Sequence, residues 1–113
     1  MKLSVIVCAY NEEKSIGPLL ENLACQRTPP EVDESEIIVV ASGCTDSTID
    51  VVKQETKKCR KITLVEEDQR SGKAEALNKA FEISTGDYIA LVPADVLPAE
   101  NAIYHLLVPF RND

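Results

Sequence analysis

Short apolar runs alternate with amphipathic stretches along the whole chain. Four runs rich in Val, Ile and Leu are apolar at nearly every position, as in strands that are buried on both faces of a parallel sheet. The stretches that follow them carry apolar residues at helical spacing. The predicted strands are Leu3–Ala9, Ile37–Ala41, Ile62–Val65 and Tyr88–Val92. The predicted helices are Ser15–Cys25, a segment from about Asp46 to Thr56, Gly72–Ile83 and Ala99–Phe110.

This β-α-β-α-β-α-β-α order predicts an α/β fold, a Rossmann-like three-layer sandwich. Repeated β-α units favour a mostly parallel sheet with right-handed crossovers and helices on both faces. The length of 113 residues fits a single domain over residues 1–113. Ligands of such sheets bind beyond the carboxyl ends of the strands, near the point where the strand order reverses. Candidate site residues are therefore those that follow each strand.

Local signals mark the helix ends and the buried helix face. Ser15 is predicted to cap the first helix and Thr45 or Asp46 the second, because short polar side chains accept hydrogen bonds from free amides there. In the third helix, apolar residues at helical spacing predict the face that packs on the sheet. These residues are Ala74, Leu77, Ala80 and Phe81.

The composition is that of a soluble globular protein, with 44% hydrophobic and 27% charged residues. The net charge of -7 and the aromatic fraction of 4% argue against a nucleic-acid partner, which requires a basic face and stacking platforms. No stretch approaches the roughly 18 apolar residues of a membrane span. The chain is therefore predicted to contain no membrane span.

The four cysteines are widely spaced, and no C-x-x-C pair occurs. The single His105 has no neighbouring ligand, so a zinc site is not expected. Cys8 lies in an apolar strand and Cys25 in a helix. Both are predicted to be buried, reduced thiols, which indicates a cytoplasmic protein.

The residues that follow the strands have complementary chemistry. Tyr10 is an aromatic side chain that can stack on a base, and Ser42–Gly43 is a tight turn whose backbone can approach a ligand closely. Arg70 and Lys73 flank the start of a helix, where free amides and the helix dipole favour an anion. Asp95 follows the last strand, and a hard cation can bridge it to a phosphate. Together they suit a base, a diphosphate and a divalent metal.

Each of these residues also has a plain structural interpretation. Tyr10 is equally expected as an aromatic at the boundary of the core. Taken by itself, Lys73 is expected to be a solvated lysine in the first turn of a helix. Asp95 by itself is expected to cap a short turn or helix. Their coincidence at the strand ends is what favours a binding site.

Four segments carry a resemblance to a known family. They are SVIVCAYNEE at residues 4–13, IVVASGCTDST at 38–48, GKAEALNKA at 72–80 and GDYIALVPAD at 86–95. In this order and spacing they resemble the motifs of family 2 glycosyltransferases of the GT-A fold. The resemblance implies that residues 1–113 form the nucleotide-sugar-binding half of a GT-A domain.

Such a domain transfers a sugar from a nucleoside-diphosphate sugar to an acceptor, usually with inversion and with Mg²⁺ or Mn²⁺. The resemblance implies a nucleoside site at Ala9, Tyr10 and Glu12, with Ser42 near the base. Lys73 and Arg70 are implied to face the pyrophosphate. The motif of the last strand adds Ala94 for the substrate and Asp95 for the metal.

The sequence departs from the family pattern in three ways. Pro93 stands where the first carboxylate of the Asp-x-Asp motif is usual, and Ala41–Ser42 stand where an acidic pair is usual. The family's domain is also considerably longer, and its catalytic base lies in the acceptor-side half. We therefore expect a fragment whose catalytic residues are unknown, with membrane association, if any, through C-terminal regions.

One alternative to a transferase remains. A non-catalytic relative, which binds a nucleotide sugar or is purely structural, is favoured by Pro93 and Ala41. A half-domain also exposes a sheet edge, which suits a homodimer. A nucleotidyltransferase or a dinucleotide-binding oxidoreductase requires a Gly-rich loop after the first strand, and Tyr10–Glu13 is not one.

Overall fold

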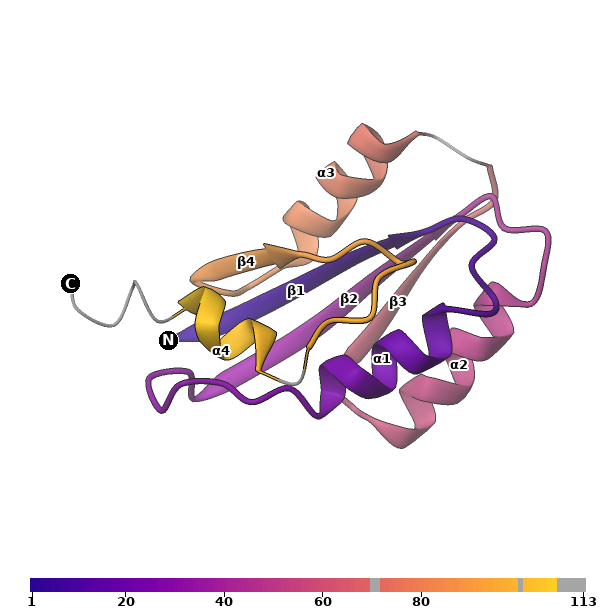
Figure 1. The fold of residues 1–113 in the computed structure, drawn as a ribbon. Helices are drawn as coiled ribbons and strands as arrows, with labels where there is room; N and C mark the ends of the chain where they lie inside the picture. Colours follow the sequence, from indigo (N-terminus) through magenta and orange to yellow (C-terminus); the bar gives the residue numbers. More distant parts are fainter. Residues whose placement is uncertain (70–71, 100, 108–113) are drawn as a thin grey trace.

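Four strands alternate with four helices, as predicted (Figure 1). The computed structural model describes residues 1–69, 72–99 and 101–107. The strands are β1 (Lys2–Ala9), β2 (Glu34–Ser42), β3 (Ile62–Glu67) and β4 (Tyr88–Leu91). The helices are α1 (Ile16–Ala24), α2 (Thr48–Lys58), α3 (Lys73–Ile83) and α4 (Ala102–Leu107).

The sheet has the order β3-β2-β1-β4, and all its pairings are parallel. The chain moves outward from β1 through β2 to β3, then crosses back to place β4 on the other side of β1. The strand order therefore reverses between β1 and β4. A crevice forms at the carboxyl ends of the strands at such a switch point.

Helices cover both faces of the sheet, which confirms the three-layer sandwich (Figure 1). On one face, α1, α2 and α4 bury the larger core, in which Leu19, Leu20 and Val52 pack around Val7 and Val39. On the other face, α3 is the only helix of the described residues that packs on the sheet. Its residues Ala76 and Ala80 lie against a smaller core.

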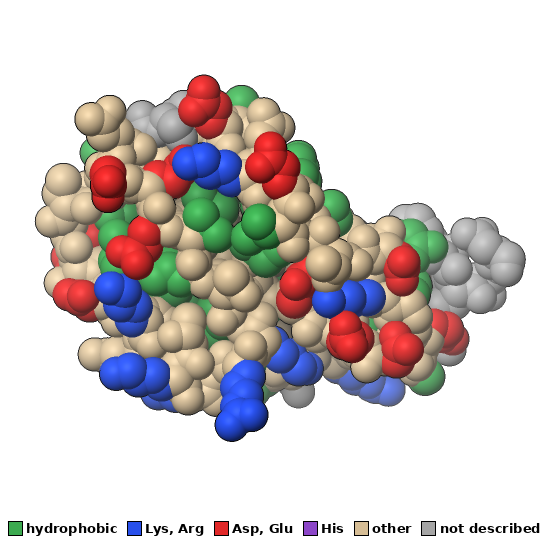
Figure 2. All heavy atoms as spheres, turned by 180° about the vertical axis from the view of Figure 1, so that it is seen from behind, with side chains coloured by type: hydrophobic (Ala, Val, Ile, Leu, Met, Phe, Trp, Pro, Cys, Tyr) green, Lys and Arg blue, Asp and Glu red, His purple; other side chains and the backbone are tan. Residues whose placement is uncertain are grey.

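The α3 face is only partly covered. Ile89 and Leu91 of β4 are 43% and 54% exposed. Figure 2 shows this side of the molecule, where hydrophobic side chains lie among acidic and basic ones. The predicted inner face of α3 is wrong for Ala74 and Phe81, which are exposed. The prediction is confirmed for Ala80 and Leu77, which pack on the smaller core, and Ala76 also faces the sheet. The small side chains of Ala76 and Ala80 let α3 approach β1 and β2 closely.

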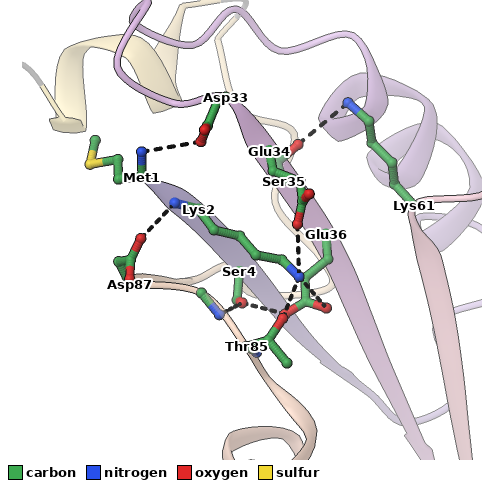
Figure 3. A network of polar contacts seen from close by, with 11 residues as sticks. Met1, Lys2, Ser4, Asp33, Glu34, Ser35, Glu36, Lys61, Thr85 and Asp87 are labelled. Carbon is green, nitrogen blue, oxygen red and sulfur yellow. Dashed lines mark hydrogen bonds and ion pairs between the residues drawn. The ribbon is translucent and has the colours of Figure 1, made fainter.

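A turn before β4 is bound to the start of β1 through a buried hydroxyl (Figure 3). The Oγ atom of Ser4, which is fully buried, accepts a hydrogen bond from the Gly86 amide at 2.9 Å and donates one to Glu36 at 2.5 Å. A Cβ atom on Gly86 would lie 2.5 Å from that same Oγ atom. The turn therefore accepts no side chain at this position.

Glu36 of β2 joins the same network (Figure 3). Its Oε2 atom accepts hydrogen bonds from the amide of Thr85 at 2.8 Å and from its hydroxyl at 3.2 Å. The amide of Lys2 donates to Asp87 at 2.8 Å, and the Lys2 ammonium pairs with Glu34 at 3.2 Å. The turn before β4 is thus held by both β1 and β2.

The network lowers the pKa of Glu36. Partial burial alone would raise this pKa, but hydrogen bonds from Ser4 and Thr85, together with the charge of Lys2, outweigh it. Glu36 is therefore ionised at neutral pH. Since its folded-state pKa lies below the ordinary 4.5, its contribution to stability is present above that value and is lost as the pH falls through the folded pKa.

Several local predictions are corrected by the structure. Ser15 makes no side-chain cap for α1, because its hydroxyl donates to the Glu12 carboxylate at 3.0 Å. Of the two cysteines predicted to be buried, Cys25 is exposed and Cys8 is only partly buried. The last helix begins at Ala102, not Ala99, and the predicted end at Phe110 lies outside the described residues. Among the helices described, none is long and apolar enough to span a bilayer.

Replacing Glu36 by Gln should destabilise the fold by about 1–3 kcal/mol at neutral pH, because a charged acceptor of three hydrogen bonds is lost. The difference from wild type should shrink as the pH falls below 4.5 and through the lowered folded-state pKa, because the wild-type carboxylate then becomes protonated as well. Urea unfolding at neutral and acid pH measures both effects. Glu34→Gln is the matched control, because Glu34 pairs with the same lysine but its side chain is 69% exposed. A pH-independent difference would contradict the assignment.

Candidate functional site

A cleft of about 360 Å³ opens at the carboxyl ends of β1, β2 and β4. Its volume is within the roughly 300–1,000 Å³ of typical small-molecule sites. Six of the predicted site residues line it: Ala9, Tyr10, Glu12, Ser42, Ala94 and Asp95. The structure therefore brings together side chains from three strand ends at the switch point.

The strands fix the depth of these residues in the cleft. Ala9 ends β1 and is buried, and Tyr10 after it is exposed. Ser42 ends β2 and is buried, with its hydroxyl donating to the Gln69 carbonyl at 3.3 Å. Ala94 is buried in the core, and Asp95 after it is exposed. The cleft thus has a closed base and polar groups near its mouth.

Apolar side chains make up much of the wall. Ile6 and Val40 come from the sheet, Ala76 and Leu77 from α3, and Leu91 from β4. An apolar wall with few polar groups is typical of sites that bind a flat ring and fix its orientation with a small number of hydrogen bonds.

An asparagine joins the loops after β1 and β2. Asn11 adopts the left-handed backbone conformation, with φ of 50°, which Asn tolerates better than most residues. Its Oδ1 atom accepts hydrogen bonds from the amides of Thr45 at 2.8 Å and Asp46 at 3.3 Å. The local sequence around Asn11 does not predict this role, because its partners lie 34 and 35 residues away.

Further bonds between these two loops run in both directions. The Glu13 amide donates to Asp46 at 3.3 Å, and the Ser47 amide donates to the Glu13 carboxylate at 3.2 Å. The Glu12 amide donates to the buried hydroxyl of Thr48 at 2.8 Å. The backbone that carries Tyr10 and Glu12 is therefore fixed against the start of α2.

Asp46 is the acid at the centre of this loop pair. Its Oδ1 atom accepts from the Thr48 amide at 2.9 Å, so it meets the first amide of α2 from a position just before the N-cap residue Ser47. Desolvation alone would raise the pKa of Asp46, but hydrogen bonds from Thr48 and the Glu13 amide outweigh it and lower the pKa. The carboxylate is therefore ionised at neutral pH and keeps accepting these bonds.

The amino end of α3 opens on the cleft. Gly72 lines the cleft and has φ of 94°, a conformation that favours glycine, and Lys73 after it is the first residue of α3. Arg70 lies outside the described residues, as does the side chain of Lys73. The free amides of a helix start favour an anion at this position.

An ion pair fixes α3 beside the end of β3. The Lys79 ammonium lies 2.5 Å from the buried carboxylate of Glu67, and the Glu67 carbonyl accepts from the Gly43 amide at 2.9 Å. The hydrogen bond that the Lys79 ammonium donates to Glu67 raises the pKa of Lys79, although some desolvation opposes it. This contact sets the distance between α3 and the loop after β2.

The cleft offers little for a metal ion by itself. Among the described residues, no three His, Cys, Asp or Glu side chains converge. Asp95 lies at the cleft with Pro93 two residues before it. Mg²⁺ is commonly held by one or two carboxylates with waters and substrate phosphates, so Asp95 fits a metal site that a bound diphosphate completes.

The sequence of residues 4–113 matches the family described as glycosyl transferase family 2. The chain belongs to this family. It is 36% identical to a probable glycosyltransferase, YdaM, of Bacillus subtilis strain 168, over 99% of this chain and 27% of that protein. It is also 36% identical to a poly(ribitol-phosphate) beta-glucosyltransferase of Bacillus spizizenii, over 84% of this chain and 15% of that protein. The family 2 chain thus spans only about a quarter or less of these relatives.

Solved structures of glycosyltransferases share the fold. A mannosyltransferase from Pyrobaculum calidifontis, in complex with GDP-Man and Mn²⁺, superposes with a TM-score of 0.77 at 39% identity, over 87% of this chain and 29% of that one. TarS of S. aureus, in complex with UDP-GlcNAc, gives a TM-score of 0.73 at 34% identity, over 84% and 27% of the two chains. This confirms the GT-A fold of the family 2 domain.

Asn11→Ala should destabilise the domain by about 1–2 kcal/mol, because two amides of the neighbouring loop lose their acceptor. The alanine variant also places a less tolerant residue in the left-handed backbone conformation. Asn11→Gly separates this backbone strain from the loss of the acceptor, since glycine adopts the conformation without strain but also lacks the side-chain amide. We expect the midpoint of thermal unfolding of the glycine variant to lie between those of the alanine variant and the wild type. A glycine variant as stable as wild type would show that backbone strain alone matters.

Proposed function

We propose that this family 2 domain binds a nucleoside-diphosphate sugar in the cleft and that the protein transfers the sugar to an acceptor. One observation supports the proposal most strongly. Six residues that were predicted for the donor site, from their place after the strands or from the family resemblance, line a single cleft at the switch point. Relatives that match nearly all or most of this chain are named glycosyltransferases.

The cleft suits the three parts of such a donor. The base would stack near Tyr10 and Ala9, against the apolar wall, with the Ser42 hydroxyl at its edge. The diphosphate would lie at the amino end of α3, within reach of Arg70 and Lys73. Glu12 would face the nucleoside, and Ala94 would lie beside the sugar.

The reaction needs charge stabilisation more than covalent chemistry from the protein. An oxygen of the acceptor hydroxyl attacks the anomeric carbon as the bond from that carbon to the diphosphate oxygen breaks, which inverts the configuration. A bound Mg²⁺ or Mn²⁺ would neutralise charge on the leaving diphosphate. Asp95 would hold the metal. The base that takes the hydroxyl proton is expected in the part of the longer relatives that this chain does not span.

The candidates for the nucleobase of the donor are uracil and guanine. One structural relative holds GDP-Man and another UDP-GlcNAc. The cleft presents Ser42 in place of an acid at the end of β2, so the base meets a hydroxyl that can donate as well as accept. Parallel titrations with uridine and guanosine nucleotides identify the preferred base.

Calorimetric titration with UDP, GDP and their sugars, with and without Mn²⁺, tests donor binding. We expect Mn²⁺ to tighten diphosphate binding and Asp95→Asn to remove most of that gain, by about ten-fold, because the metal loses its protein ligand. Asp50→Asn, an exposed change on α2 outside the cleft, is the matched control. No binding heat from a folded protein would refute the donor site, and an unchanged Mn²⁺ gain in Asp95→Asn would refute the ligand.

Lys73→Ala should weaken binding of the diphosphate about ten-fold and leave binding of the nucleoside nearly unchanged, because a cation at a helix start acts on the phosphates. Competition titrations with a nucleoside and its diphosphate measure the difference. Lys57→Ala, an exposed lysine at the end of α2, serves as the control. Equal losses for nucleoside and diphosphate would contradict the role of Lys73.

A second candidate is a domain that binds a nucleotide sugar without turnover. Pro93 in place of the usual carboxylate favours it, together with the lack of a converging metal-ligand cluster in the described part of the chain. Donor binding without release of the sugar, in the presence of Mn²⁺ and a range of acceptors, would support this alternative over the transferase.

Location and assembly are also proposals. The four cysteines, all within the described residues, form no disulfide, which agrees with a cytoplasmic protein. The outer edge of β4 pairs with no strand among the described residues, and apolar Ile89 and Leu91 lie beside it, which suits a homodimer. Equilibrium sedimentation tests the dimer.

A further inference from the structure

Two amide side chains tie the loop that carries Asp95 to α1. The connection from β4 to α4 runs back past the carboxyl end of α1 (Figure 1). Asn22 lies in the last turn of α1, and Gln26 follows just beyond its end. Both are partly buried, and neither lines the cleft.

The two amides bond to consecutive carbonyls of the loop. The Nδ2 atom of Asn22 donates to the Pro98 carbonyl at 2.9 Å. The Nε2 atom of Gln26 donates to the Ala99 carbonyl at 2.7 Å and to the Asn22 Oδ1 atom at 2.8 Å. The two bonds to the loop carbonyls join residues that are 76 and 73 positions apart in the sequence.

The same glutamine also fixes the start of α4. Its Oε1 atom accepts from the Ile103 amide at 3.1 Å, so Gln26 uses both of its N–H groups and its oxygen. Each bond determines which end of an amide is nitrogen and which is oxygen, so the pair has one consistent orientation. Arg27 lies over the ring of Tyr104 at 4.8 Å and adds a contact between the same two segments.

The other end of the loop is fixed by the sheet. The Val92 amide donates to the Ile6 carbonyl at 3.0 Å, which continues the ladder beyond β4, and Ala94 is buried in the core. Between the two ends, the Val96 amide donates to the Pro93 carbonyl at 3.3 Å and closes a turn. Asp95 lies inside this turn and reaches the cleft.

We propose that Asn22 and Gln26 are positioning residues for Asp95. The inference rests on the proposed function, in which Asp95 is the metal ligand. With Pro93 in place of a second carboxylate, a single side chain must lie at the correct place. A loop that is ordered before the ligand binds loses less conformational entropy on binding, and this strengthens the contact.

The first test needs no ligand. Gln26→Glu has nearly the same shape but loses the donor to the Ala99 carbonyl and places a carboxylate beside it. In nuclear magnetic resonance relaxation, the order parameters of the Asp95 and Val96 amides should fall from about 0.85 to below about 0.6. Asn22→Asp, which loses the donor to Pro98, should act in the same direction. Gln54→Glu makes the same chemical change at an exposed position on α2 and is the control.

The second test measures metal-dependent binding of UDP or GDP, whichever binds more tightly. Gln26→Glu should reduce the gain in affinity from Mn²⁺ by about ten-fold and change the metal-free affinity by less than about two-fold. A purely structural role would weaken both affinities alike. Equal losses with and without Mn²⁺ would therefore overturn the positioning role.

The two tests separate this inference from the proposed function. Unchanged order at Asp95 and Val96 in both variants overturns the inference whether or not a nucleotide binds. Lower order with a full Mn²⁺ gain overturns it as well. If wild type shows no Mn²⁺ gain at all, the proposed metal role of Asp95 fails, and Asn22 and Gln26 then position no metal ligand, whatever the order parameters show.

Discussion

The buried hydroxyl of Ser4 in β1 joins β2 and the turn before β4, and the strands of the domain are arranged around this junction. The hydroxyl lies fully buried between β1, β2 and the turn before β4, and it is hydrogen-bonded to the Gly86 amide and the Glu36 carboxylate. β4 pairs beside β1 and does not extend the sheet beyond β3, and the Ser4 hydroxyl holds the turn that precedes β4. That choice of neighbour creates the switch point, and the switch point creates the cleft at the opposite end of the strands. The Ser4 contact and the cleft thus lie at opposite ends of the same β1–β4 pairing.

The sequence was sufficient to predict the alternation of strands and helices and the residues at the strand ends. Both follow from local patterns: apolar runs define strands, and the carboxyl ends of parallel strands share one edge. Apolar spacing alone misplaced the face of α3, because it weighted the large Phe81 over the small Ala76, while close packing on a sheet favours small side chains. Local patterns do not predict the hydrogen bonds of Asn11, Asn22 and Gln26. Each side chain bonds to backbone groups far along the chain, and the sequence around an asparagine or glutamine gives no sign of such a partner.

The cleft combines well-fixed walls with few carboxylates. Its loops are tied to one another by side-chain to backbone hydrogen bonds, from Asn11 on one side to Gln26 on the other. The only carboxylates that line it are Glu12 and Asp95 in the described part of the chain, and Glu12 already accepts a bond from Ser15. Rigid backbone is a reasonable physical compensation for few ligands, since geometry that is fixed in advance lowers the entropy lost on binding.

Helix α3 contributes both to the cover of the sheet and to the wall of the cleft. It is the only described helix that covers one face of the sheet, and its amino end opens on the cleft. A ligand bound at that end would contact the same helix that covers the smaller core. Binding in the cleft and the free energy of unfolding of the domain are therefore linked. An anion that binds there would raise the melting temperature, and above the dissociation constant the rise would grow with the logarithm of the anion concentration.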